Sequence, residues 1–229
     1  MVALSLLSLL LATTTLAAPS KKKGFHGACK VPASAFPLPQ SFSSLTSSPT
    51  YVTMGFGNQN YTCNSAGNYT SLGAVGQMFD VSCLYRKPEF SDIQEDAFNI
   101  WSNCTGDDPL EPRMAQLFKK LWNIPVVGQH YFVDGKNASD NPVPVFDFTS
   151  AGRTKGNKKA IFFGEKIEDV TSPGGVQNVD WLELQEVSGE LADKVYRVDT
   201  VEGQPPPTCK PGSADITVKY ATKYLLTGN

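Results

Sequence analysis

The sequence is poor in the residues from which most catalytic and metal sites are built. It has only two histidines, His26 and His130, and contains no His-x-x-x-His, Cys-x-x-Cys or calcium-loop pattern, so no metal site is predicted. It also lacks the Gly-x-Ser-x-Gly turn that carries the nucleophile of many hydrolases. Because His26 lies in the N-terminal tail, His130 is the one candidate general base in the body of the chain.

Charge and long apolar runs are also scarce. Charged residues make up 18% of the chain, against roughly 25% in an average globular protein, and the formal net charge is −2. No basic excess exists to attract nucleic acid. After the N-terminus no apolar run approaches the roughly 20 residues of a membrane span, and no lipid-anchor signal is present, so neither nucleic acid nor a membrane anchor is expected.

The N-terminus has the pattern of an export signal. Residues 2–16 are uncharged and mostly apolar, and small residues around Ala17 suit a signal peptidase. Residues 1–17 are therefore predicted to be a signal peptide, and the protein to be secreted and extracellular. Residues 21–23 are three lysines that are either a processing site or a solvated tail. Residues 18–50 are rich in Pro, Ser and Thr and predict an extended arm or linker, followed by a single mainly-β domain over residues 51–229.

The chain contains five cysteines, which in a secreted protein indicate disulfides with one thiol left over. Sequence alone does not fix the connectivity. We expect Cys63–Cys83 to close a local loop, Cys29–Cys209 to join the arm to the far end, and Cys104 to be unpaired.

Four N-x-S/T triplets predict N-glycosylation. They begin at Asn60, Asn68, Asn103 and Asn137. Asn60 is the weakest candidate because it lies in a predicted strand.

Glycine- and proline-rich turns separate short runs of β-forming residues from residue 51 onward. Two segments differ, because apolar side chains recur at helical spacing from Phe90 to Trp101 and from Met114 to Trp122. The pattern predicts a mainly β fold, an antiparallel sandwich or barrel with two short inserted helices. Strands are expected at 51–55, 57–63, 73–83, 126–133, 143–148, 160–163, 179–187, 194–200 and 215–225.

One motif invites a dinucleotide-binding interpretation. Gly55 and Gly57 begin a glycine pattern with Asp80 downstream, but Asn60 replaces the third glycine, and β-forming residues follow where a helix should start. The sequence therefore disfavours a dehydrogenase, and no cofactor is predicted.

The remaining candidates are scattered polar and aromatic side chains. His130 with a carboxylate from Asp180 or Asp199 is the basis of a hydrolase hypothesis, although a lone histidine on a strand is more often a structural hydrogen-bonding group. Trp181 and Tyr131, with Tyr196, would form a sugar-stacking surface if they shared one face.

Several strings occur in an order that resembles a known family. They include Gly57-Asn-Gln-Asn-Tyr-Thr-Cys63, Val127-Gly-Gln-His-Tyr-Phe132, Asn178-Val-Asp-Trp-Leu-Glu-Leu184 and Val195-Tyr-Arg-Val-Asp-Thr200. Together they resemble domain-of-unknown-function family 3455, over roughly residues 50–225. The resemblance implies a secreted domain with no assigned activity. Some members carry the label malate dehydrogenase, which these residues do not support.

The resemblance also marks individual positions. The recurrent ones are His130, Asp180, Trp181, Arg197, Asp199, Thr200 and Cys209. We predict that Arg197 and Asp199, two residues apart on one strand, share a face and form an ion pair.

The favoured hypothesis is a secreted, non-catalytic glycoprotein. It would act as a monomer that binds cell-wall polysaccharide or a host surface. The candidate functional surface comprises His130, Tyr131, Asp180, Trp181, Arg197 and Asp199.

Overall fold

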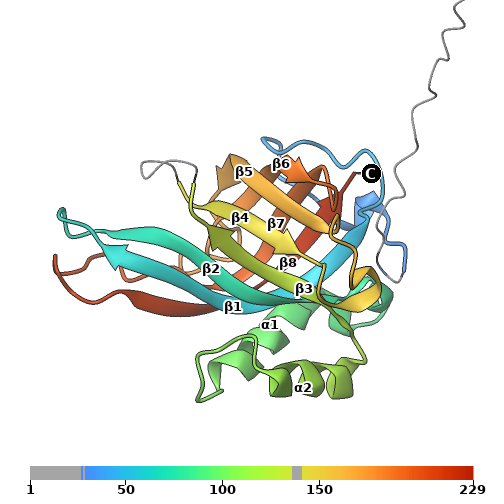
Figure 1. Cartoon of the computed structure of the whole chain (residues 1–229), viewed down its shortest axis with the longest axis horizontal. Helices are drawn as coiled ribbons and strands as arrows, with labels where there is room; N and C mark the ends of the chain where they lie inside the picture. Colours follow the sequence, from blue (N-terminus) through green and yellow to red (C-terminus); the bar gives the residue numbers. More distant parts are fainter. Residues whose placement is uncertain (1–26, 28, 136–140, 229) are drawn as a thin grey trace, which may run out of the picture.

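Eight antiparallel strands form a closed barrel in which each strand pairs with its neighbour in the chain and β1 pairs with β8 (Figure 1). The computed structural model describes residues 27, 29–135 and 141–228. The prediction of a mainly β fold with two helices is confirmed, and of the two architectures that the sequence allowed, the barrel is correct. The elements are β1 (Tyr51–Cys63), β2 (Tyr69–Asp80), α1 (Glu89–Ser102), α2 (Pro112–Trp122), β3 (Val126–Val133), β4 (Val143–Asp147), β5 (Ile161–Val170), β6 (Trp181–Gly189), β7 (Lys194–Glu202) and β8 (Ile216–Thr227).

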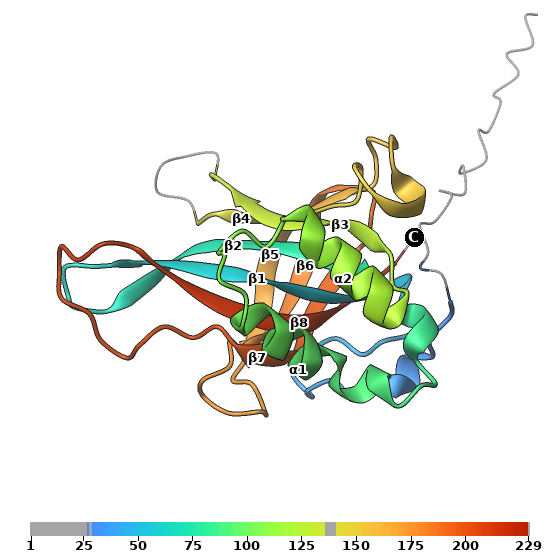
Figure 2. The ribbon, with the colours of Figure 1, turned by 90° about the horizontal axis from the view of Figure 1, so that it is seen from below.

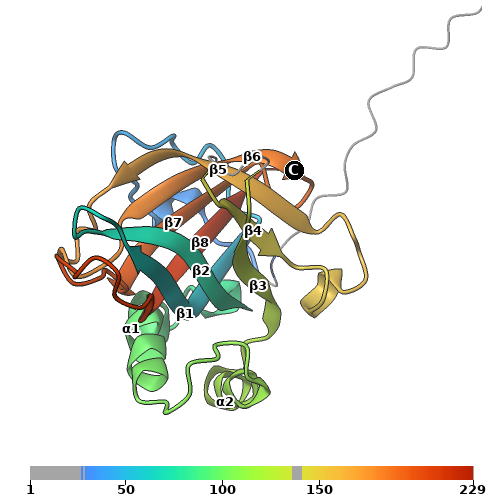
Figure 3. The same ribbon diagram turned by 60° about the vertical axis from the view of Figure 1, so that its left-hand side comes forward.

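The first and last strands, β1 and β8, close the barrel (Figure 3). β1 pairs with β8 from Tyr51 opposite Leu226 to Tyr61 opposite Ile216. β1 also joins the two strands expected at 51–55 and 57–63 into one, so residues 55–60 form no turn into a helix. The strand at 126–133 has the predicted bounds, whereas β5 continues to Val170, beyond the predicted end.

The barrel interior is packed with large side chains from strands all around it. Phe146, Phe162 and Tyr224 meet there, and each is at most 1% exposed. Glycine makes room for them, since a Cβ at Gly55 would lie 2.9 Å from the Tyr224 ring. The interior is therefore a core over most of its length.

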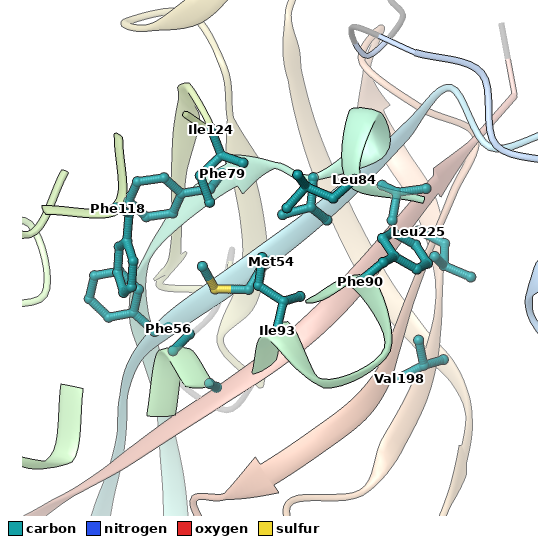
Figure 4. Close-up of a cluster of buried hydrophobic side chains, with 14 of the residues drawn as sticks. Met54, Phe56, Phe79, Leu84, Phe90, Ile93, Phe118, Ile124, Val198 and Leu225 are labelled. Carbon is teal, nitrogen blue, oxygen red and sulfur yellow. The ribbon is translucent and has the colours of Figure 1, made fainter. Parts of the chain in front are cut away.

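A second core lies outside the barrel wall, under the helices (Figures 2 and 4). The apolar faces of α1 and α2 cover Met54 and Phe56 of β1, whose side chains point away from the barrel interior. Trp101 of α1 also donates its indole N–H to the Gly57 carbonyl over 2.9 Å. These helices therefore seal one side of the barrel.

The disulfide connectivity differs from the prediction. Cys29 pairs with Cys83 and Cys63 pairs with Cys209, while Cys104 is the free thiol, as expected. The first pairing arises because the arm runs back beside the end of β2, where the Cys29 N–H donates to the Ser82 hydroxyl over 3.0 Å. The second pairing joins the end of β1 to the loop that precedes β8, and β8 lies next to β1 in the sheet.

The described part of the N-terminal arm, residues 29–50, packs on the outer wall instead of hanging free (Figure 2). Val31, Phe36 and Phe42 join the outer core. The predicted signal peptide, 1–17, lies outside the described residues. No helix in the described part of the chain is long and apolar enough to cross a membrane.

Candidate functional site

The structure divides the predicted site residues among three places. His130 lies inside the barrel, with Arg197 and Asp180 toward one end of it. Tyr131 lies on the outer face of β3, and Trp181 and Asp199 line a pocket on the outer wall beside the arm. They therefore do not form one site.

His130 is an internal packing residue. Its ring is 3% exposed and stacks on Phe146 with centroids 4.3 Å apart. Its Nδ1 atom lies 2.9 Å from the Val145 carbonyl. Burial lowers the pKa of His130 to about 4, although the Val145 hydrogen bond opposes the shift. The imidazole is therefore neutral at physiological pH and enclosed by aromatic rings.

This placement removes the arrangement that the hydrolase hypothesis needs. Asp199 lies outside the barrel wall and His130 inside it, so the two do not converge. Asp180 hydrogen-bonds through its carbonyl to Arg197, which is also a neighbour of His130, but no contact joins His130 to Asp180 in the described part of the chain.

Tyr131 and Tyr196 do not form a surface with Trp181. The Tyr131 hydroxyl donates to the Asp147 carboxylate over 3.3 Å, between β3 and β4. Tyr196 is 2% exposed beneath the arm, where its hydroxyl donates to the Ser43 carbonyl. The proposed three-residue stacking face is therefore wrong, and only Trp181 lines the pocket.

The predicted ion pair between Arg197 and Asp199 is also wrong. The Arg197 Nε atom donates to the Asp180 carbonyl over 2.9 Å, and the side chain interacts with Tyr224 inside the barrel. Asp199 instead pairs with Lys223 Nζ over 3.0 Å, and that ammonium also donates to the Ser91 carbonyl of α1. The two side chains therefore leave β7 on opposite sides of the wall.

A bulge in β7 causes this reversal. The pairing with β8 shifts register between Val198 and Val201, and Asp199 and Glu202 have φ values of +50° and +57°. A bulge re-aims side chains and breaks the alternation of faces, and strained backbone of this kind clusters at functional sites. Asp199 therefore points into the outer pocket, in a conformation that a regular strand does not use.

The outer pocket, which we call the arm pocket, has a volume of about 290 Å³. Most of its wall is aromatic or apolar, the charged side chains are Asp199 and Lys223, and Ser91 and Tyr85 carry hydroxyl groups. The arm forms one side and α1 another, with β6, β7 and β8 behind. Its lining residues are Ala35, Phe36, Pro37, Leu38, Tyr85, Phe90, Ser91, Trp181, Val198, Asp199 and Lys223.

The polar groups of the arm pocket are unequally available. The Asp199 side chain is 34% exposed, whereas that of Lys223 is 2% exposed, with its ammonium 5.3 Å from the Phe90 ring centroid. The Trp181 indole N–H is buried and has no hydrogen-bond partner. The pocket thus offers one accessible carboxylate, that of Asp199, within a mostly aromatic and apolar wall.

A polar clasp holds the arm in place. Glu183, 1% exposed, accepts a hydrogen bond from the Ser43 N–H over 2.7 Å and pairs with Lys194. Lys194 in turn donates to the Ser43 hydroxyl. Burial acts to raise the pKa of Glu183, but the Lys194 and Ser43 hydrogen bonds outweigh it and lower the pKa. With the Cys29–Cys83 disulfide, the clasp fixes both ends of the segment that forms the pocket wall.

The predicted glycosylation sites differ in their setting. Asn68 lies in the β1–β2 hairpin and Asn103 at the end of α1, and both are exposed. Asn60 lies within β1, paired with Gly73 and Thr217 on its two sides. Asn137 lies outside the described residues. Asn68 and Asn103 therefore remain the most accessible candidates.

Sequence reasoning missed Lys223 and the contribution of the arm. Lys223 is not among the predicted site residues, although α1 covers it and it pairs with Asp199. The available signal was the run Tyr-Leu-Leu directly after Lys223, because a continuous apolar run indicates a strand that is buried on both faces. Nothing in residues 29–50 indicated that they form a pocket wall.

The molecule is thus a closed antiparallel barrel with a covered outer wall and a small aromatic pocket under an N-terminal arm. It belongs to the family described as a protein of unknown function, DUF3455, whose match covers residues 44–228. The resemblance noted in the sequence is confirmed. No curated protein and no solved structure matches the chain significantly.

Proposed function

We propose that this protein is a secreted, non-catalytic binding module whose arm pocket takes a single sugar ring of an extracellular polysaccharide, such as a cell-wall glycan. The observation that carries the proposal is the Asp199 carboxylate, presented from a strained bulge into an aromatic pocket. The expected signal peptide and the two disulfides support export to an oxidising compartment.

The size of the arm pocket favours one ring over an extended chain. Its volume of about 290 Å³ lies at the lower end of the range for small-molecule sites. A polysaccharide would therefore engage it through a chain end or a side branch.

The chemistry of the pocket suits a neutral, hydroxyl-rich ligand. Aromatic faces such as that of Trp181 pack against the apolar C–H face of a sugar. The Asp199 carboxylate, which is 34% exposed, accepts strong hydrogen bonds from hydroxyl groups. Because Lys223 balances the charge of Asp199, the pair disfavours a charged ligand.

The mature protein would be a monomeric glycoprotein. Glycans at Asn68 and Asn103 leave the arm pocket free, since neither residue lines it. A host surface that displays the same sugars is an equivalent partner.

Retention on insoluble polysaccharides tests the proposal. Purified protein is incubated with chitin, β-glucan, mannan or cellulose, and the bound fraction is measured. We expect retention on at least one of them and a loss of about 10-fold in affinity for Asp199→Asn, which removes the charge of the acceptor, and for Trp181→Phe, which removes part of the aromatic face. Tyr131→Phe, outside the pocket, is the matched control. Retention on none of the four, or equal losses in the control, contradicts the proposal.

A further inference from the structure

Arg197 is a partly buried cation that is near the Asp180 side chain but not in an ion pair with it. It lies inside the barrel wall, near His130 and Tyr224. Among the residues that the structure describes it forms no salt bridge, and its Nε atom donates to the neutral carbonyl of Asp180. A guanidinium held in low-dielectric surroundings is stabilised by an anion.

The Gln59 side chain supplies a buried donor that has no hydrogen-bond partner in the described part of the chain. The Gln59 side chain is 5% exposed, and its Nε2 atom has no hydrogen-bond partner. Gln59 packs beside Gly203. A Cβ atom added to Gly203 would lie 3.4 Å from the Gln59 Cγ atom and 2.8 Å from the Tyr220 Cβ atom. Buried amides without a partner are uncommon and need an explanation.

Three tyrosines, Tyr61, Tyr220 and Tyr224, lie in the region of Arg197 and Gln59. Tyr220 and Tyr224 share a hydrogen bond of 3.2 Å, and Tyr61 donates to the Gly203 carbonyl over 2.8 Å. Arg197 acts electrostatically on all three tyrosines. The guanidinium and the three hydroxyls therefore belong to one polar cluster, and the Gln59 side chain lies beside it, next to Gly203 and the Tyr220 Cβ atom.

From this cluster we propose that the barrel end around Arg197 and Gln59 binds a small organic monocarboxylate. The planar guanidinium matches a carboxylate in geometry, and the Gln59 amide supplies an additional donor. Because Arg197 keeps partial exposure, the anion reaches it from solvent.

The surroundings select the class of anion. Ala74, Val179 and Phe132 form an apolar cluster with Tyr220 at this end, which suits the hydrocarbon part of an organic acid. Asp180 is close enough for Arg197 to act on its pKa, and its carboxyl group disfavours a second negative charge. Because Asp180 is not in an ion pair with Arg197, the guanidinium remains open to one carboxylate, whereas the Asp180 carboxyl group repels the additional charge of phosphate or a dicarboxylate.

This site is separate from the arm pocket. Arg197 and Gln59 do not line that pocket, and the barrel wall lies between Arg197 and Asp199. The proposal therefore stands or fails independently of polysaccharide binding.

An NMR titration of the full disulfide-bonded protein tests it. Acetate, propionate and benzoate are added to ¹⁵N-labelled protein at constant ionic strength, with chloride, phosphate and succinate as competing anions. We expect saturable shifts centred on the amides of Gly76 and Gly203, which adjoin Tyr220. Arg197→Met should lower the affinity at least about 10-fold and Gln59→Leu about 3- to 10-fold. Arg113→Met, which removes an exposed arginine elsewhere, should leave it unchanged.

Each outcome decides the proposal. A wild-type dissociation constant weaker than about 10 mM for all three carboxylates overturns it, as does tighter binding of phosphate or succinate. If Arg197→Met does not fold, Arg197→Lys keeps the charge without the planar fork and should still weaken binding. Unchanged affinity in both Arg197→Lys and Gln59→Leu overturns the assignment of these residues.

Discussion

The Lys223–Asp199 pair predicts an asymmetry between two substitutions, because its charges are buried to different extents. The Lys223 side chain is 2% exposed and that of Asp199 is 34% exposed. If the Asp199 charge is removed, an ammonium remains inside the wall with only the Ser91 carbonyl and the Phe90 ring as partners. If Lys223 is replaced by an apolar side chain, the remaining carboxylate is hydrated. Loss of the aspartate charge should therefore destabilise the fold more.

The magnitudes follow from the burial. Asp199→Asn should lower the free energy of unfolding by about 3 kcal/mol, the lower end of the range for an uncompensated buried charge. Asparagine is chosen because it tolerates the φ of +50° at this position. Lys223→Met keeps an apolar side chain of similar length and should lower the free energy of unfolding by about 1 kcal/mol. The double variant should resemble Lys223→Met alone, since no unpaired ammonium then remains.

Equilibrium urea unfolding with the disulfides intact measures these differences. Lys166→Ala is the control, because its pair with Asp169 is exposed on both sides and should contribute less than about 1 kcal/mol. Equal destabilisation by the two single variants refutes the reasoning. So does a double variant whose loss is the sum of the two.

Two further predictions concern the barrel interior and a disulfide. The pKa of His130 falls from 6.5 to about 4 on folding. The free energy of unfolding of the wild type should therefore decrease by up to about 3 kcal/mol as the pH falls from 6.5 to 4. His130→Gln should not show this decrease when urea unfolding is measured at a series of pH values. Replacing Cys63 and Cys209 by serine opens a loop of sequence separation 146 and should lower the free energy of unfolding by up to about 5 kcal/mol. A loss below 1 kcal/mol would argue against that loop-entropy account.

The strands were largely predictable because their sequence alternates or is β-branched. β8 was expected at 215–225 and occupies Ile216–Thr227. β5 was predicted too short because its second half, from Glu165 to Asp169, is rich in charge and faces solvent, so it lacks the apolar alternation. Pattern alone did not separate sandwich from barrel, because closure depends on the pairing of β1 with β8, which are far apart in sequence.

The candidate site was less predictable, for local reasons. Strict alternation places Arg197 and Asp199 on one face, and the β7 bulge that separates them leaves no recognisable signal in the sequence. The disulfides depended on where the arm lies, and residues 29–50 carry no periodicity that indicates it. For His130 the absence of a nucleophile motif favours a structural hydrogen-bonding role, and the structure buries the ring with its Nδ1 atom 2.9 Å from the Val145 carbonyl.

The pairing of Tyr51 with Leu226 has a consequence for the order in which the chain acquires its structure. During synthesis the first strand emerges early, yet the partner for one of its edges emerges nearly last. Until then the edge exposes unpaired N–H and C=O groups, which invite association with other chains. Long-range pairing of this kind also slows folding. A chain that stops before residue 216 leaves two open edges, on β1 and β7, so premature termination should yield an aggregating product instead of a smaller soluble one.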